Sequence, residues 1–202
     1  MSIFSKLSFK DQAFKLRETA ILDATAQTLA EKGFDLMTMD DVANLVGISK
    51  PVLYKHFKSK EELVGAAMIR LLGEAIDQLK GLPDTMSPLA KLKVLLSWAL
   101  DVRLKGGLPF LPSTAQHVRD MLMRNLHYVA LVLSLNKQLK KIVQAAKAAG
   151  ELRSDLPDDV ILFSYYARTC DPTVEYLRTY SKMDDAEIIA HMLEVCFAGV
   201  AV

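Results

Sequence analysis

The chain has 202 residues, which is enough for one large domain or for a small domain followed by a larger one. Its 25 Lys and Arg residues balance 24 Asp and Glu residues, which excludes nucleic-acid binding through overall positive charge and leaves only a local basic surface. The two cysteines, Cys170 and Cys196, exclude a disulfide framework and fit a reducing compartment. No stretch is apolar enough for a signal peptide or a membrane span, which predicts a cytoplasmic protein with no membrane partner.

The N-terminal residues predict a basic arm followed by a long helix. The helix is expected from about residue 11 to residue 32, because Leu22, Ala26 and Leu29 recur at helical spacing. Gly33 follows this stripe and is expected to end the helix.

The stretch from Thr38 to Lys60 predicts two short helices joined by a tight turn. Thr38 is a good N-cap for the first helix, and acidic residues follow in the first turn, where the helix dipole favours them. Gly47 can take the left-handed conformation that ends this helix, and Ser49 is a second N-cap with Pro51 just behind it. This order of signals over about twenty residues is typical of a helix-turn-helix.

The second of these helices combines cations and a hydroxyl with a lack of acidic residues. Between residues 42 and 60 the chain has no Asp or Glu. The cationic and hydroxyl-bearing residues are Lys50, Tyr54, Lys55, His56, Lys58 and Lys60. Such a helix suits the major groove of double-stranded DNA, with its first turn toward base edges and its cations on phosphates. The spacing alone also allows a small helical hairpin whose lysines only face solvent.

The run GISKPVLYKHFKSKEEL, residues 47–63, closely resembles the DNA-binding signature of the TetR family of bacterial transcriptional regulators. Residues 21–43 resemble the helix and turn that precede that signature, so the resemblance covers about residues 17 to 64. The resemblance implies DNA contacts for Thr38, Lys50, Pro51, Val52, Tyr54, Lys55, His56 and Lys60.

The resemblance also implies roles for individual residues. Phosphate contacts are implied for Thr38, Tyr54 and Lys60, and base contacts for Lys50 and the first turn of the second helix. In that turn the chain has Pro and Val where the family often has Gly, Ala or Thr. Apolar side chains there favour contact with a thymine methyl group over hydrogen-bonded readout.

The rest of the chain predicts helices and no strand. The expected fold is all-α, with a three-helix helix-turn-helix domain over residues 1–58 and a larger effector-binding and dimerisation domain over residues 59–202. Further helices are expected at about 60–80, 88–105, 113–150, 157–170 and 184–200. The segment 113–150 is either one helix or two, with a break near Asn125 or Asn136.

The middle helices are rich in adaptable apolar side chains with a few polar groups among them, a mixture typical of a ligand pocket between bundle helices. The residues alone equally allow an ordinary core in which methionine fills gaps. The family resemblance favours a pocket for a small, largely apolar effector. The residues expected to line it are Trp98, Arg103, Phe110, His117, Met121, Tyr128, Phe163 and Tyr166.

The C-terminal helix carries a wide apolar stripe that little remaining sequence could cover, which predicts a homodimer. It is expected to join the preceding helix in an intersubunit four-helix arrangement, the alternative being that it packs wholly on the middle helices. The expected interface residues are Phe163, Ala167, Cys170, Ile189, Met192, Leu193, Cys196, Phe197 and Val200. Pro172 interrupts the long helix common at this position in the family, which puts the part beyond it in doubt as interface.

Enzyme chemistry finds little support in the sequence. The four histidines are scattered, and the chain has no zinc-ligand spacing, phosphate-binding loop or nucleophile motif, so we expect neither a metal site nor a cofactor. The expected function is a DNA-binding transcriptional regulator, in this family usually a repressor, that binds a palindromic operator as a homodimer and is released by its effector. Two alternatives remain. One is a DNA-binding protein of the same fold without an effector, regulated by a partner or organising the chromosome; the other is an all-α enzyme or binding module.

Overall fold

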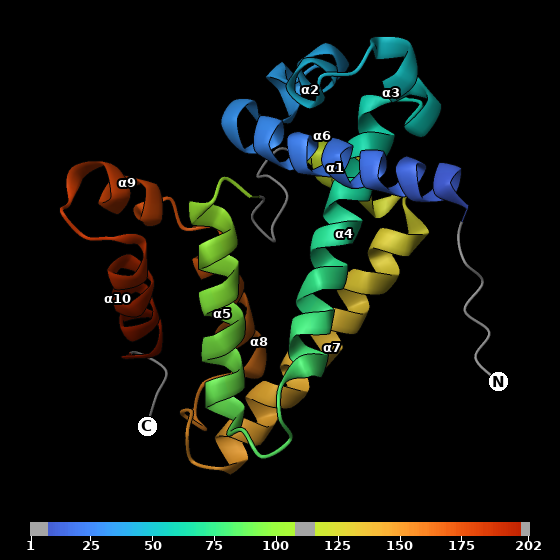
Figure 1. Ribbon diagram of the computed structural model, residues 1–202. Helices are drawn as coiled ribbons and strands as arrows, with labels where there is room; N and C mark the ends of the chain where they lie inside the picture. Colours follow the sequence, from blue (N-terminus) through green and yellow to red (C-terminus); the bar gives the residue numbers. More distant parts are fainter. Residues whose placement is uncertain (1–7, 108–115, 199–202) are drawn as a thin grey trace. The chain divides into compact units, whose positions relative to one another are not determined.

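The computed structural model describes residues 8–107 and 116–198, and within these ranges the chain is helical and contains no strand (Figure 1). The helices are α1 (Phe9–Leu36), α2 (Met39–Val46), α3 (Lys50–His56), α4 (Lys60–Gly81), α5 (Pro88–Leu104), α6 (Gln116–Met123), α7 (Leu126–Ala148), α8 (Asp158–Thr169), α9 (Thr173–Tyr180) and α10 (Asp185–Ala198). The chain divides into two compact units, Met1–Ala67 and Met68–Val202, so the division falls inside α4. The predicted all-α fold is confirmed, while the finer prediction of a domain boundary after residue 58 stays a prediction.

The first unit is built on α1, which is buried along its middle and broken near its end. Ile21 is buried, and the buried hydroxyls of Thr25 and Thr28 donate to backbone oxygens one turn earlier, each at 2.7 Å. Gly33 has φ 72° and ψ 169°, a conformation that glycine adopts far more readily than other residues. Gly33 therefore ends the regular helix, as predicted, and one further turn leads to α2.

The N-terminal part of α1 extends the helix beyond its predicted start. Ser8 and Asp11 form a capping box, in which the Ser8 hydroxyl accepts a hydrogen bond from the Asp11 amide at 3.2 Å, so the helix begins at Phe9. Phe9 and Leu16 in this part are 87% and 72% exposed. The end of the stretch predicted as a basic arm is thus helical, because Ser8 supplies a local cap.

The predicted helix-turn-helix is formed by α2 and α3. Thr38 and Asp41 make a capping box at the start of α2, and Gly47 ends the helix in the left-handed region at φ 75°. The buried residues of α2 are Met39, Val42 and Ala43. Leu45 of the same helix is apolar but 49% exposed, because the buried face follows Met39 and Ala43, which are one turn apart.

In the second unit, α5 is the central helix and packs against α7, α8 and α10. Leu95, Leu96 and Leu100 on α5 are at most 2% exposed. The buried Tyr165 of α8 donates its hydroxyl hydrogen to the backbone oxygen of Leu92 at 3.1 Å, which satisfies the phenol and joins α8 to α5.

The segment predicted as one or two helices forms two. The side-chain oxygen of Asn125 accepts from the backbone amides of His127 and Tyr128 at 3.0 and 3.1 Å, and this cap starts α7 directly after α6 ends. Farther along, α9 follows Pro172 and is a helix that the sequence pattern did not indicate.

The start of α5 is tied to the connection between α7 and α8. The first amides of a helix have no acceptor within it. The Ser87 hydroxyl accepts from the Ala90 amide at 3.2 Å, and the Glu151 carboxylate accepts from the Leu89 amide at 2.9 Å. Two side chains from different parts of the sequence thus cap one helix.

Candidate DNA-binding surface and effector site

Helix α3, the second helix of the helix-turn-helix, has a buried edge and an accessible one. Leu53 and Phe57 are 0% and 5% exposed and anchor α3 in the core of the first unit. Four of the predicted DNA contacts are exposed, namely Lys50, Pro51, Tyr54 and Lys55, whereas Val52 is half-buried. The structure therefore presents these four side chains together on one short helix.

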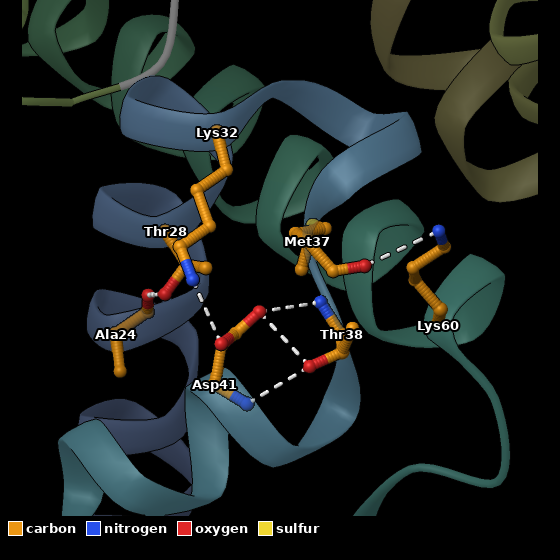
Figure 2. A network of polar contacts seen from close by, with 7 residues as sticks. All are labelled: Ala24, Thr28, Lys32, Met37, Thr38, Asp41 and Lys60. Atoms are coloured by element: carbon orange, nitrogen blue, oxygen red, sulfur yellow. Dashed lines mark hydrogen bonds and ion pairs between the residues drawn. The ribbon is translucent and has the colours of Figure 1, made fainter.

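Thr38 and Asp41 form a polar network that fixes the start of α2 against α1 (Figure 2). One carboxylate oxygen of Asp41 accepts from the amide and the hydroxyl of Thr38, both at 2.9 Å. The other lies 2.8 Å from the Lys32 ammonium. The Lys32 hydrogen bond, followed by those from Thr38, lowers the pKa of Asp41 from 3.8 to about 2. The Thr38 hydroxyl, predicted on a phosphate, is here part of the cap.

Lys60 binds backbone oxygens in the same region (Figure 2). Its ammonium donates to the oxygens of Phe34 and Met37 at 2.9 and 3.3 Å and lies 4.4 Å from the centre of the Phe34 ring. These partners belong to the end of α1 and the turn into α2. The structure thus places Lys60, predicted on a phosphate, in a structural role as well.

His56 turns toward α1 and not toward the exposed edge of α3. Its ring stacks on Phe14, with centroids 4.0 Å apart and an interplanar angle of 22°. Its Nδ1 is buried and has no hydrogen-bond partner among the described residues. Desolvation lowers the pKa of His56, against a weaker opposing influence of Glu18. Phe14 was not singled out from the sequence, because nothing local connects it with residue 56.

Lys50 is paired across the turn with α2. Its ammonium lies 2.9 Å from a carboxylate oxygen of Asp40, and the two side chains are 51% and 57% exposed. The hydrogen bond to Asp40 raises the pKa of Lys50. The sequence predicted only that Asp40 complements the dipole of α2. Its ion pair with Lys50 was not predicted.

The residues predicted to line an effector pocket lie in different settings in the second unit. Tyr128 is buried and burial raises its pKa, whereas Phe163 is 62% exposed on α8. Arg103 pairs with Glu175 of α9 at 2.6 Å. Trp98, Met121 and Tyr166 are half-buried, His117 is exposed, and Phe110 lies outside the described residues.

A cavity of about 210 Å³ lies between α5, α7, α8 and α10. Leu92, Val143 and Ile161 contribute to its apolar wall, and Ser164 and Arg168 are polar groups at its lining. None of the seven predicted effector residues that lie in the described part of the chain lines this cavity. Its walls come from four helices far apart in the sequence, so no spacing could have indicated it.

The predicted dimer residues divide into exposed and covered ones. Phe163 and Ala167 are exposed on α8, and Val195, which was not predicted, is 60% exposed on α10. By contrast, Met192 and Phe197 are 5% and 4% exposed, because α10 packs them within its own unit. The remaining predicted residues Cys170, Ile189, Leu193 and Cys196 are half-buried, and Val200 lies outside the described residues.

Within residues 8–107 and 116–198, no group of three or more His, Cys, Asp or Glu side chains could hold a metal ion. Over the same residues no helix is both long enough and apolar enough to cross a bilayer.

Sequence comparisons point to one class of protein. A family model described as bacterial regulatory proteins of the tetR family matches residues 21–67, which contain the helix-turn-helix. The chain is 31% identical to the transcriptional regulator RutR of Escherichia coli (strain K12) over 93 residues, which are 46% of this chain and 44% of RutR. This alignment therefore spans less than half of that relative. Identity to the transcriptional repressor KstR2 of Mycolicibacterium smegmatis is 25% over 191 residues, 91% of this chain and 90% of KstR2.

Solved structures share the fold. The fatty acid degradation regulator FadR of Bacillus halodurans superposes with a TM-score of 0.67 at 15% identity, over 91% of this chain and 95% of that one. FadR from Bacillus subtilis, solved in complex with stearoyl-CoA, gives a TM-score of 0.64 at 17% identity, over 90% and 98%. At these identities the likeness shows the fold alone.

Proposed function

We propose that the chain, whose residues 21–67 match the tetR family of bacterial regulatory proteins, is a DNA-binding transcriptional regulator that represses transcription as a homodimer on a palindromic operator. We further propose that a small, largely apolar effector releases it from DNA. The relatives are named transcriptional regulators, and we propose that this chain is likewise a regulator and not an enzyme.

The observation that carries the proposal is the accessible edge of α3. Lys50, Tyr54 and Lys55 are exposed there, while Leu53 and Phe57 hold the helix in the core of the unit. A helix held in this way can enter the major groove without unfolding its own support. Tyr54 and Lys55 would contact phosphates, and the first turn of α3 would face base edges.

The need for many base contacts supports a homodimer. One short helix makes few of them, and each good contact contributes about 1–3 kcal/mol of discrimination. Two heads related by a two-fold axis double that number and fix half-sites about 34 Å, or a multiple, apart. The exposed apolar residues Phe163 and Val195, on α8 and α10, supply a face that a second copy of the chain could cover.

The second unit has a cavity that supports the proposal of a small effector. It contains the cavity of about 210 Å³ described above, with apolar walls and few polar groups. KstR2 is named a repressor, and the Bacillus subtilis FadR structure contains stearoyl-CoA, which supports a repressor with a lipophilic effector. Such a ligand releases DNA only if it binds the DNA-incompetent state more tightly, because equal affinity for both states shifts nothing.

The proposal is tested by selecting binding sites from a pool of duplexes with randomised sequence. We expect wild-type protein to enrich a palindrome. The Lys55→Ala variant should bind all duplexes more weakly, and its slope of log K against log salt should be shallower by about one, because one phosphate contact is lost. Lys141→Ala, an exposed lysine on α7, is the matched control and should bind as wild type does. Failure to enrich any palindrome would count against operator binding by a symmetric dimer.

The effector is tested with the operator selected in this way. Lipophilic compounds are screened for release of labelled operator and for a change in the fluorescence of Trp98, which is the single tryptophan of the chain. We expect at least one chemical class to do both. A broad screen with neither response would favour a DNA-binding protein controlled in another way.

A further inference from the structure

The Asp40–Lys50 ion pair places a carboxylate next to the first residue of the recognition helix. Asp40 is in the first turn of α2 and Lys50 begins α3, so the pair bridges the two helices of the helix-turn-helix. The ammonium and the carboxylate oxygen are 2.9 Å apart, and both side chains are about half exposed, at 51% and 57%. The pair therefore lies in water, at the end of α3 that would approach base edges.

An ion pair at this place changes what the lysine attracts. A phosphate attracts a protein cation through net charge, and each neutralised phosphate releases a counterion. The paired Lys50 and Asp40 have no net charge, and a phosphate near Lys50 would also meet the Asp40 carboxylate. The ammonium has three N–H donors, and the bond to Asp40 uses one of them. Two donors remain for neutral acceptors such as O6 and N7 of guanine.

We propose that Asp40 is a specificity-determining residue. It cancels the charge of Lys50, so that this lysine donates hydrogen bonds to base edges and does not contribute to phosphate binding. This inference rests on the proposed function, because it assumes that α3 enters the major groove. An acidic residue beside the DNA would thus help the protein to discriminate between DNA sequences.

The experiment compares wild type, Asp40→Asn, Lys50→Met and the double variant on a duplex of random sequence over a series of salt concentrations. Asp40→Asn should bind the random duplex roughly three- to tenfold more tightly at about 0.1 M salt, and the slope of log K against log salt should steepen by about one. In the Lys50→Met background the same change should have a clearly smaller effect, because it removes only the repulsion between the carboxylate and phosphates and releases no cation. On the selected operator the gain should be smaller, so the ratio of operator to random affinity should fall.

Asp77→Asn is the matched control, because Asp77 also forms an exposed pair at 2.9 Å, with Lys80 on α4 in the second unit. It makes the same change in net charge and should leave the salt slope unchanged. Thermal melting confirms that each variant is folded.

The other possible outcomes contradict either this inference or the proposed function. If Asp40→Asn strengthens binding equally with Met at position 50, Asp40 repels phosphates by itself and the inference is wrong. An unchanged slope in Asp40→Asn, or an equal effect of Asp77→Asn, also overturns it while the proposed function stands. Wild-type protein that binds no duplex would overturn the proposed function, and this inference with it.

Discussion

His56 occupies an apolar position at the end of α3. Its ring stacks on Phe14, and desolvation lowers its pKa below the usual 6.5. The fold therefore favours the neutral imidazole. In the unfolded chain the imidazole protonates near its ordinary pKa, so between the two pKa values the unfolded state binds more protons.

We predict that His56 makes the first unit less stable in mild acid. Its contribution is fully present above pH 6.5 and is lost as the pH falls through the lower pKa of the folded protein, because protonation favours the unfolded state. Denaturant unfolding from about pH 8 to pH 5 should show a smaller loss of unfolding free energy for His56→Gln than for wild type. His191→Gln, at an exposed histidine of α10, should follow wild type. Parallel curves for wild type and His56→Gln would contradict the prediction.

Lys60 is predicted to stabilise the first unit independently of DNA. Its ammonium binds the oxygens of Phe34 and Met37, and loss of charged hydrogen bonds costs about 1–3 kcal/mol. Lys60→Met should lower the free energy of unfolding by about that amount. The exposed neighbour Lys58 provides the control variant, Lys58→Met, which should stay within about 0.5 kcal/mol of wild type. If both variants unfold alike, the bonds of Lys60 contribute nothing in solution.

At the residue scale, local chemistry was predictable and partners distant in the sequence were not. Thr38 and Gly47 were identified because a cap involves only residues within one turn. The acceptor of Lys60 at Phe34 lies 26 residues earlier, and no periodicity connects the two. The same reason explains why the stack on Phe14 was missed.

At the element scale, Gly33 controls the passage from α1 to α2. Its φ of 72° lies where an added Cβ strains the backbone, although no atom lies within 4 Å of that Cβ position. A substitution of Gly33 therefore destabilises the fold through backbone strain and not through a steric clash.

We predict that Gly33→Ala lowers the free energy of unfolding by about 1–3 kcal/mol. Gly73, in the middle of α4, has equally open surroundings and no positive φ, so Gly73→Ala should instead stabilise the protein by about 0.5–1 kcal/mol. Equilibrium unfolding in denaturant measures both. A neutral Gly33→Ala variant would show that the chain can bend there without a left-handed residue.

Among the elements, the helices with local end signals were predicted best. The start of α5 at Pro88 and the break at Asn125 follow from capping residues that the sequence displays. The eight-residue α9 was not predicted, because a proline usually interrupts a helix, although it is also tolerated at a helix start, as at Pro172.

At the scale of the whole molecule, the exposed apolar face of α8 and α10 sets the prediction for assembly. Val195→Asp and Phe163→Asp should each yield monomers, because the carboxylate would be buried without a partner in the dimer. Leu126→Asp, at a residue that is 84% exposed at the start of α7, should remain dimeric. Light scattering distinguishes the two states. A folded Val195→Asp dimer would place the interface elsewhere.

Phe197 is unsuitable for that test, although the sequence favoured it as an interface residue. It is 4% exposed within one protomer, so Phe197→Asp would disturb the fold itself. The apolar stripe of α10 was visible in the sequence, but which part of it faces α5 depends on the packing of other helices. Sequence periodicity identifies a buried face and does not say which molecule buries it.

The bond between the Glu151 carboxylate and the Leu89 amide has a kinetic consequence. Amides in the first turn of a helix usually exchange their hydrogen rapidly with water, since they lack an acceptor in the helix. The Leu89 hydrogen is held by a side chain 62 residues later, so it exchanges when the α7–α8 connection leaves the start of α5. Hydrogen exchange at this one amide thus reports a cooperative opening within the second unit and not fraying of α5. On the ribosome, the same bond can form only after α7 has been synthesised. During translation α5 therefore lacks the Glu151 cap until that point.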